Sequence, residues 1–223
     1  MAYLEGQTLE QKIAECPLKF DDALDIAAQI ANGLAEAHGK GIYHRDIKPS
    51  NAMLLEKGSS GHLVKIMDFG LAHLTGQSQL TQKDTSLGTP AYMSPGQAEG
   101  RPTDHRTDIW SLGVVLYEMI VGQMPFQGEY QQAIIYSILH EDYEPVTALR
   151  AGVPMELEWI VGKCLEKDPA RRYQSAAELV VDLENQREKL KAGKSRLSRS
   201  VAGTIAASTP AGPSHPPSGP APV

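Results

Sequence analysis

The segment from Thr107 to Val121 constrains the possible fold most, because its apolar residues lie on nearly every side of a helix. They are Ile109, Trp110, Leu112, Val114, Val115, Leu116, Met119 and Ile120. A helix that is hydrophobic all round has to be buried all round, and Gly122 directly after it provides a stop. We therefore predict a globular core in which this helix is enclosed by other elements.

The rest of the chain predicts a mainly α body (α+β class) around that helix. Apolar residues recur at helical spacing from residue 21 to His38, with Asp21 or Asp22 as the cap and Gly39 as the stop. Further helices are predicted over residues 130–140, 155–166 and 175–191. Only residues 52–56 and 63–67 alternate as strands do. The fold class is therefore helical with a few short strands.

Phosphoryl transfer requires an oriented hydroxyl, a magnesium ion on the phosphates and positive charge. Two polar stretches of the sequence carry side chains that suit these needs. Asp46 can accept a hydrogen bond from a hydroxyl, and Lys48 can reach a γ-phosphate. Asn51 and Asp68 offer neutral and charged oxygen ligands for Mg²⁺. The stretches are His44-Arg45-Asp46-Ile47-Lys48-Pro49-Ser50-Asn51 and Asp68-Phe69-Gly70.

These stretches closely resemble the catalytic loop and the magnesium-binding loop of protein kinases, and three further motifs follow in the family's order. They are Gly88-Thr89-Pro90-Ala91-Tyr92-Met93-Ser94-Pro95, Asp108-Ile109-Trp110-Ser111-Leu112-Gly113 and Asp168-Pro169-Ala170-Arg171-Arg172-Tyr173. The first is most similar to bacterial receptor-type Ser/Thr kinases. The resemblance covers residues 1 to about 190 and implies the large kinase lobe, ATP and Mg²⁺ as cofactors, and protein substrates.

The resemblance also implies catalytic and cofactor-binding roles for individual residues. Asp46 becomes the catalytic base, Lys48 a phosphate contact, and Thr89 the threonine that bonds to both of them. Asn51 and Asp68 become the metal ligands. Met53 corresponds to the residue that packs under the adenine, although a Met on an apolar strand is equally a core filler.

Other residues receive structural or regulatory roles from the same resemblance. His44 is expected to pack beneath the magnesium loop against Phe69, and Asp108 to bond backbone amides of the catalytic loop. Arg45 is expected to pair with a phosphorylated residue of the activation segment. The candidate phosphosites are Thr85 and, as alternates, Thr81 and Ser86, and the competing interpretation is that all three are ordinary loop hydroxyls.

One position departs from the family inside the matching region. Kinases have a glutamate after the Ser/Ala-Pro of the activation segment, where this chain has Gly96, and that glutamate pairs with the arginine matching Arg172. Removing one partner of a buried ion pair costs about 3 to 5 kcal/mol, because the remaining charge is uncompensated. Either Arg172 has found Glu99 or another acid, or the substrate-binding segment is loosened.

The small kinase lobe is not encoded in these residues. Met1-Ala2-Tyr3-Leu4-Glu5-Gly6 is similar to the hinge between the lobes, and the sequence has neither G-x-G-x-x-G nor a V-A-I-K lysine. We therefore expect little or no kinase activity from this polypeptide alone. Three hypotheses follow: a Ser/Thr protein kinase, a catalytically inactive kinase-like binding or scaffold module, and an incomplete fragment of a kinase.

Composition divides the chain into a kinase-like domain at 1–190 and a linker at 191–223. The linker has four basic and no acidic residues, six prolines after residue 209, and a composition that predicts disorder. The net charge of −6 therefore conceals an acidic body, which argues against a nucleic-acid partner. Two lone cysteines, no signal peptide and no membrane span in this chain predict a cytoplasmic location, although full-length relatives can be membrane-anchored.

Overall fold

The computed structural model describes residues 6–56, 61–69 and 90–206. By contacts the chain divides into two units, Met1–Arg187 and Glu188–Val223. The first unit holds the core and all of the predicted site residues that the structure describes. The second consists, within those residues, of the end of one helix. No helix in the described ranges has both the length and the apolar character of a membrane span.

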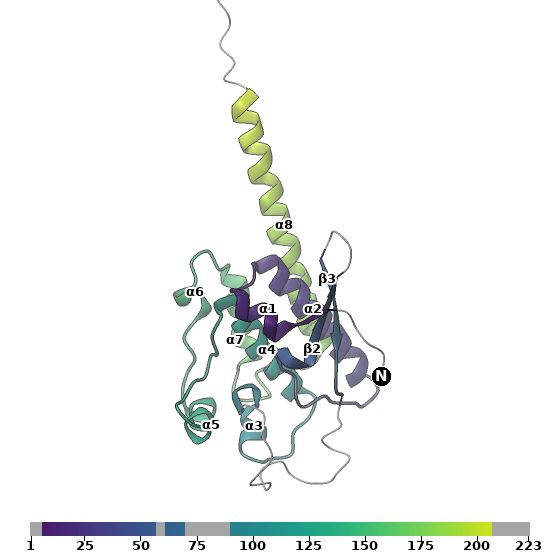
Figure 1. Ribbon diagram of the computed structural model, residues 1–223, viewed down its shortest axis with the longest axis vertical. Helices are drawn as coiled ribbons and strands as arrows, with labels where there is room; N and C mark the ends of the chain where they lie inside the picture. The colour runs from purple at the N-terminus through teal and green to yellow at the C-terminus, as the bar shows by residue number, and fades with distance from the viewer. Residues whose placement is uncertain (1–5, 57–60, 70–89, 207–223) are drawn as a thin grey trace, which may run out of the picture. The chain divides into compact units, whose positions relative to one another are not determined.

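Helix α4 (Arg106–Val121) is the centre of the first unit, as the sequence predicted. All of its residues except Arg106, Glu118 and Val121 are buried, and Trp110 and Tyr117 are among the largest fully buried side chains. Helices α2 (Phe20–His38) and α7 (Met155–Cys164) pack against it (Figure 1). Gly122 ends α4 with a φ of 82°, a left-handed conformation that glycine adopts without a steric penalty.

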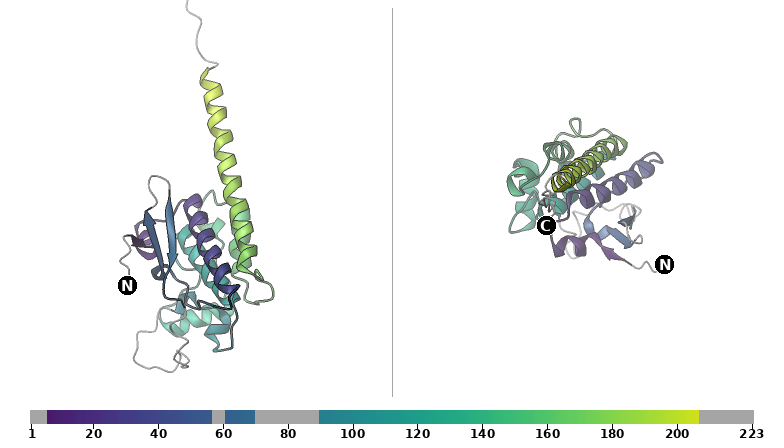
Figure 2. Two further views of the ribbon diagram at one scale, coloured as in Figure 1. Left: turned by 90° about the vertical axis from the view of Figure 1, so that its right-hand side faces the viewer. Right: turned by 90° about the horizontal axis from the view of Figure 1, so that it is seen from above.

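A three-stranded antiparallel sheet lies beside α2, which Figure 2 shows from the side. It consists of β1 (Gln7–Thr8), β2 (Ala52–Glu56) and β3 (His62–Ile66), with Ala52 opposite Ile66. Gln29 of α2 completes the hydrogen bonding of β3, since its side chain bonds to the His62 carbonyl at 2.9 Å and the Val64 amide at 3.0 Å. The sheet therefore determines where the segment before β2 and the segment after β3 lie.

The predicted helices and strands are present, with shifts of a few residues at their ends. Helix α2 begins one residue early, after Lys19, so that the two expected caps, Asp21 and Asp22, lie in its first turn. Helix α7 ends at Cys164 rather than at residue 166, and α5 (Gln131–His140) follows Tyr130. The sequence did not predict β1 or three short helices, which are α1 (Leu9–Glu15), α3 (Pro95–Ala98) and α6 (Val146–Leu149).

Helix α8 (Ala176–Ala206) is longer than predicted. The Ser175 hydroxyl caps its first turn by accepting a hydrogen bond from the Glu178 amide at 3.2 Å. Arg187 forms an ion pair with Asp25 of α2 at 2.5 Å. The helix continues past residue 191, where the sequence predicted a disordered linker, because the next residues include good helix formers and no proline lies between residues 176 and 209. The remainder of the predicted linker, residues 207–223, lies outside the described residues.

Candidate active site

Asp108, in the first turn of α4, binds the backbone of His44 and Arg45. Its carboxylate accepts hydrogen bonds from the amides of His44 at 2.9 Å and Arg45 at 2.6 Å, and the residue is fully buried. Arg45 has a φ of 64°, which is uncommon for a residue with a side chain. Such a conformation persists only where the surroundings determine it, and Asp108 supplies part of that constraint.

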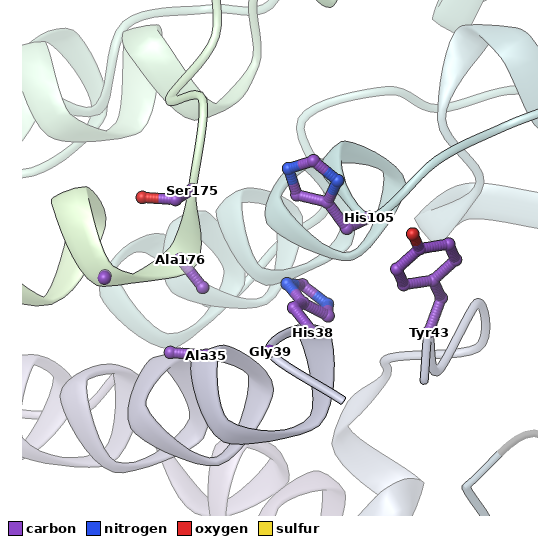
Figure 3. Close-up of a pocket in the computed structure, with 8 residues that line it drawn as sticks. Ala35, His38, Gly39, Tyr43, His105, Ser175 and Ala176 are labelled. Atoms are coloured by element: carbon purple, nitrogen blue, oxygen red, sulfur yellow. The ribbon is translucent and has the colours of Figure 1, made fainter. Parts of the chain in front are cut away.

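Behind the loop, Asp108 is also bound by His38 at the end of α2. The Nε2 atom of His38 lies 2.9 Å from Oδ2 of Asp108. The His38 ring makes edge contacts with Tyr43 and His105, at centroid distances of 5.8 and 5.4 Å. These side chains line a cavity of about 300 Å³ (Figure 3), together with Ala35, Gly39, Ser175, Ala176 and Ala177. The carboxylate is thus held by the end of α2 as well as by the loop.

His44 connects the catalytic loop to the start of the magnesium loop. Its Nδ1 accepts a hydrogen bond from the Asp46 amide at 3.3 Å, and its Nε2 lies 2.8 Å from the Met67 carbonyl oxygen. A neutral imidazole protonated on Nε2 satisfies both contacts. The ring also packs edge-on against Phe69 with centroids 4.8 Å apart. His44 is buried, so the predicted packing role agrees with its position.

Asp46, Lys48 and Asn51 form a small polar cluster that faces solvent. Nζ of Lys48 lies 2.8 Å from Oδ2 of Asp46, whose side chain is 53% exposed and therefore open to a substrate hydroxyl. The Asn51 amide nitrogen donates to the Asp46 carbonyl oxygen at 2.8 Å and to its carboxylate at 3.0 Å. These bonds use the nitrogen of Asn51 and leave its side-chain oxygen as a possible metal ligand.

Asn51 and Asp68 lie at neighbouring ends of paired strands, which suits a shared metal ion. The Met67 amide donates to the Asn51 carbonyl oxygen at 2.9 Å, directly beyond the Ala52–Ile66 pair. Asp68 is exposed and has a φ of 57°. The described residues contain no cluster of three or more His, Cys, Asp and Glu suited to a metal. One carboxylate and one amide oxygen nevertheless fit Mg²⁺, which takes its other ligands from phosphates and water.

The other predicted site residues divide into described and undescribed ones. Met53 is half-buried on β2, between the buried residues Ala52 and Leu54, so its side chain lies on the face of the sheet away from theirs. This position is compatible with an adenine contact, which stays a prediction. The candidate phosphosites Thr81, Thr85 and Ser86 and the catalytic candidate Thr89 lie outside the described residues.

The side chain of Arg45 is suited to bind an anion. Its guanidinium lies over the Tyr43 ring, 5.8 Å from the centroid. Its Nε is buried and has no hydrogen-bond partner among the residues that the structure describes. An unsatisfied buried donor on a charged group is costly, and a phosphate would satisfy it. The predicted pairing with a phosphorylated residue remains a prediction.

Arg172 forms an ion pair neither with Glu99 nor with another acid among the described residues. Glu99 pairs with Arg101 instead, and no ion pair of Arg172 occurs among the described residues. Its guanidinium donates to the carbonyl oxygens of Glu166 at 2.5 Å and Lys167 at 2.9 Å, and it lies 4.9 Å from the Trp110 ring centroid. Burial, and then repulsion by Arg106, lowers the pKa of Arg172 to about 10.

Two further polar residues of this region were not singled out from the sequence. Gln97 is the N3 residue of a capping box whose N-cap is Ser94, a pattern that sequence alone can show. Glu118 accepts a hydrogen bond from the Tyr92 hydroxyl at 2.8 Å, and burial raises the pKa of its carboxyl group. Its signal was an acid within the apolar stretch at the end of the helix.

Comparison with known proteins agrees with this geometry. The family described as "Protein kinase domain" matches residues 1–182. A probable serine/threonine-protein kinase of Clostridium perfringens is 40% identical over 185 residues, which are 82% of this chain and 26% of that protein. The serine/threonine-protein kinase PknB of Mycobacterium tuberculosis is 39% identical over 186 residues, 82% of this chain and 29% of its own length.

PknB of Mycolicibacterium smegmatis is 41% identical over 187 residues, again 82% of this chain and 29% of the relative. The chain therefore spans less than a third of the length of these relatives. The matched part contains the catalytic loop, the start of the magnesium loop and the buried helix that carries Asp108. On the extent of these matches and the order of its motifs, the chain belongs to the serine/threonine branch of the protein kinase family.

Proposed function

We propose that this chain supplies the catalytic large lobe of a Ser/Thr protein kinase, which transfers the γ-phosphate of ATP to hydroxyls of protein substrates. The observation that carries the proposal is the cluster of Asp46, Lys48 and Asn51. It is open to solvent on one side and fixed on the other through the bonds of His44 and Arg45. A rigid backbone with an accessible acid is what a positioned catalytic base requires.

In this mechanism Asp46 accepts a hydrogen bond from the substrate hydroxyl and orients its oxygen toward the phosphate. Lys48 is already 2.8 Å from Asp46, so it is close enough to contact the transferring group next to the base. The side-chain oxygen of Asn51 and the carboxylate of Asp68 would hold Mg²⁺. That ion would neutralise phosphate charge when ATP is bound. Met53 would pack against the adenine, and Thr89 would bond to Asp46 and Lys48.

We further propose that phosphorylation of the activation segment, at Thr85 or at Thr81 or Ser86, orders that segment through Arg45. The Nε of Arg45 supports this assignment, because it is buried and has no hydrogen-bond partner among the described residues. The two cysteines, Cys16 and Cys164, are both free. Free thiols fit the reducing cytoplasm, which we propose as the location.

The second candidate function is a catalytically inactive binding or scaffold module. One observation favours it: Gly96 stands where the family has a glutamate. The intact acid and amide groups of the catalytic loop favour the first candidate. Binding alone does not require an exposed, positioned carboxylate.

A chimeric enzyme distinguishes the two functions. The small lobe of the Clostridium perfringens relative is fused ahead of Met1, and transfer of radiolabelled phosphate from ATP to a generic basic protein is measured with Mg²⁺. We expect transfer by the chimera, a loss of about 100-fold or more in Asp46→Asn, and little or no transfer by the 223-residue chain. An inactive chimera beside an active parental relative would contradict the kinase proposal and support the scaffold.

A further inference from the structure

Gln97 joins three elements that meet at the active site. Its side-chain nitrogen donates to the Arg45 carbonyl oxygen of the catalytic loop at 2.8 Å. Its side-chain oxygen accepts from the Thr107 hydroxyl of α4 at 2.7 Å and from the Ser94 amide at the start of α3 at 3.0 Å. The Ser94 and Thr107 hydroxyls are themselves 2.6 Å apart. One amide group therefore connects the end of the activation segment, the central helix and the catalytic loop.

The bond from Gln97 acts on the peptide unit that directly precedes the proposed base. The carbonyl of that unit belongs to Arg45 and is held by Gln97, whereas its N–H belongs to Asp46 and is held by His44. The preceding amide, that of Arg45, is held by Asp108. Arg45 is left-handed, with a φ of 64°, so this peptide orientation depends on the contacts that hold it. Of these contacts, the one from Gln97 comes from the activation segment.

The chemistry of the contact requires an amide. Gln97 donates to one carbonyl and accepts from two donors at the same time, and a carboxylate can only accept. A glutamate would place a negative oxygen against the Arg45 carbonyl oxygen. Capping alone does not require an amide, since Glu and Gln serve equally at the N3 position of a capping box. The local and the long-range roles of Gln97 therefore predict opposite results for Gln97→Glu.

We propose that Gln97 is a positioning residue, which fixes the Arg45–Asp46 peptide and thereby couples the end of the activation segment to the orientation of the catalytic base. This inference rests on the proposed kinase function for its catalytic consequence, but not for its structural part. A displacement of α3 would be transmitted through Gln97 to the backbone of Asp46, while Asp108 and His44 keep the rest of the loop in place.

The chain contains a matched control for the test. Helix α1 begins with the same capping box, in which the Thr8 amide donates to the Gln11 side chain at 2.9 Å and the Gln11 amide donates to the Thr8 hydroxyl at 3.2 Å. The hydrogen bonds that the structure describes for Gln11 are both with Thr8. Gln11→Glu therefore changes a cap whose described hydrogen bonds do not reach the catalytic loop.

Amide hydrogen exchange of the 223-residue chain measures the structural part. We expect exchange at the Arg45 and Asp46 amides to become at least about tenfold faster in Gln97→Glu, and to stay unchanged in Gln11→Glu. Gln97→Met is the second variant, because it removes the donor without adding charge. Unchanged exchange in both Gln97 variants would overturn the proposal whether or not any kinase activity is found.

Steady-state kinetics of the chimera measure the catalytic part. We expect Gln97→Glu to lower kcat about tenfold with the KM for ATP within about twofold, and activity to recover partly at acidic pH, where a protonated carboxyl can donate to the Arg45 carbonyl. A kcat equal to that of Gln11→Glu would overturn the positioning role. Faster exchange together with an inactive parental chimera would contradict the kinase function and leave the structural part standing.

Discussion

Gly96→Glu is predicted to stabilise the protein, because it restores an acid that kinases place near the buried arginine. Arg172 is 4% exposed, and its guanidinium is bonded to backbone carbonyl oxygens rather than to a carboxylate. Its third contact, from Nη1 to the Arg106 carbonyl oxygen, is 3.5 Å long and therefore weak. Arg172 thus has donor capacity left for an acid.

The size of the stabilisation expected from Gly96→Glu follows from the lowered pKa of Arg172. Its pKa falls from 12.5 to about 10, and one pKa unit corresponds to about 1.4 kcal/mol, so the buried charge costs about 3 kcal/mol. Because the folded pKa lies below the unfolded one, this cost is complete below about pH 10 and is relieved only above it. A glutamate at position 96 loses its own hydration and side-chain freedom, which leaves a net gain of about 1 to 2 kcal/mol.

Local space at position 96 permits the substitution. A Cβ atom there would lie 3.1 Å from Cγ2 of Thr103, a contact that a shift of a few tenths of an ångström relieves. Gly96 lies within α3, so any side chain gains helix propensity and an anion gains from the helix N-terminus. Gly96→Gln is therefore the control for propensity, and repeating both substitutions with Arg172→Met controls for the helix dipole.

The assay is urea unfolding of six proteins. They are the unsubstituted chain, Gly96→Glu and Gly96→Gln, each with Arg172 and with Arg172→Met. We expect a coupling free energy of about 1 kcal/mol or more between the glutamate introduced by Gly96→Glu and the side chain of Arg172 in the double-mutant cycle. Gly96→Glu should then have a higher midpoint than Gly96→Gln only when Arg172 is present. Equal effects with and without Arg172 would refute the reasoning. They would mean that the carbonyl oxygens already satisfy the guanidinium and that the family's glutamate is dispensable here.

Two other substitutions test the core. Gly113→Ala in α4 would place a Cβ atom 2.5 Å from that of Cys164, so we expect the free energy of unfolding in urea to fall by about 1 to 3 kcal/mol. Gly193→Ala, which has open space around it, is the control and should cost nothing. Equal outcomes for the two variants would contradict the packing argument. Glu118→Gln should raise the urea midpoint at pH 8, because burial raises the pKa of the Glu118 carboxyl and so disfavours its charged form. This advantage should shrink toward pH 5, as the wild-type carboxyl becomes protonated, and an advantage that grows there would refute it.

Sequence reasoning predicted the parts of the fold that local patterns determine. The central helix was evident because its apolar residues surround it, and Gly122 marked its end through the need for a left-handed residue. Helix α3 was not predicted, since four residues give no periodicity. The end of α8 lies beyond the predicted residue 191, because the small and polar residues between 192 and 206 include enough helix formers to extend the helix.

The site was predicted wherever a motif fixes the backbone, and less well where partners come from distant segments. The contacts of His44 with Phe69 and of Asp108 with the loop amides followed from the motifs. The carbonyl partners of Arg172 did not, because backbone oxygens have no sequence signature. For the same reason the bond from Gln97 to the Arg45 carbonyl oxygen could be found only in three dimensions.

The described contacts anchor the start of the catalytic loop, at His44 and Arg45, on α4. Asp108 receives donors from both sides, since the loop amides of His44 and Arg45 bind it from the front and His38 binds it from behind. A buried carboxylate with three bonded donors is strongly destabilised by the loss of any one of them. The loop can therefore open only by breaking contacts with the most deeply buried helix of the protein. Local fraying of β2 and β3 leaves the bonds to Asp108 in place, so the amides of His44 and Arg45 should stay protected from exchange until contacts around α4 are lost.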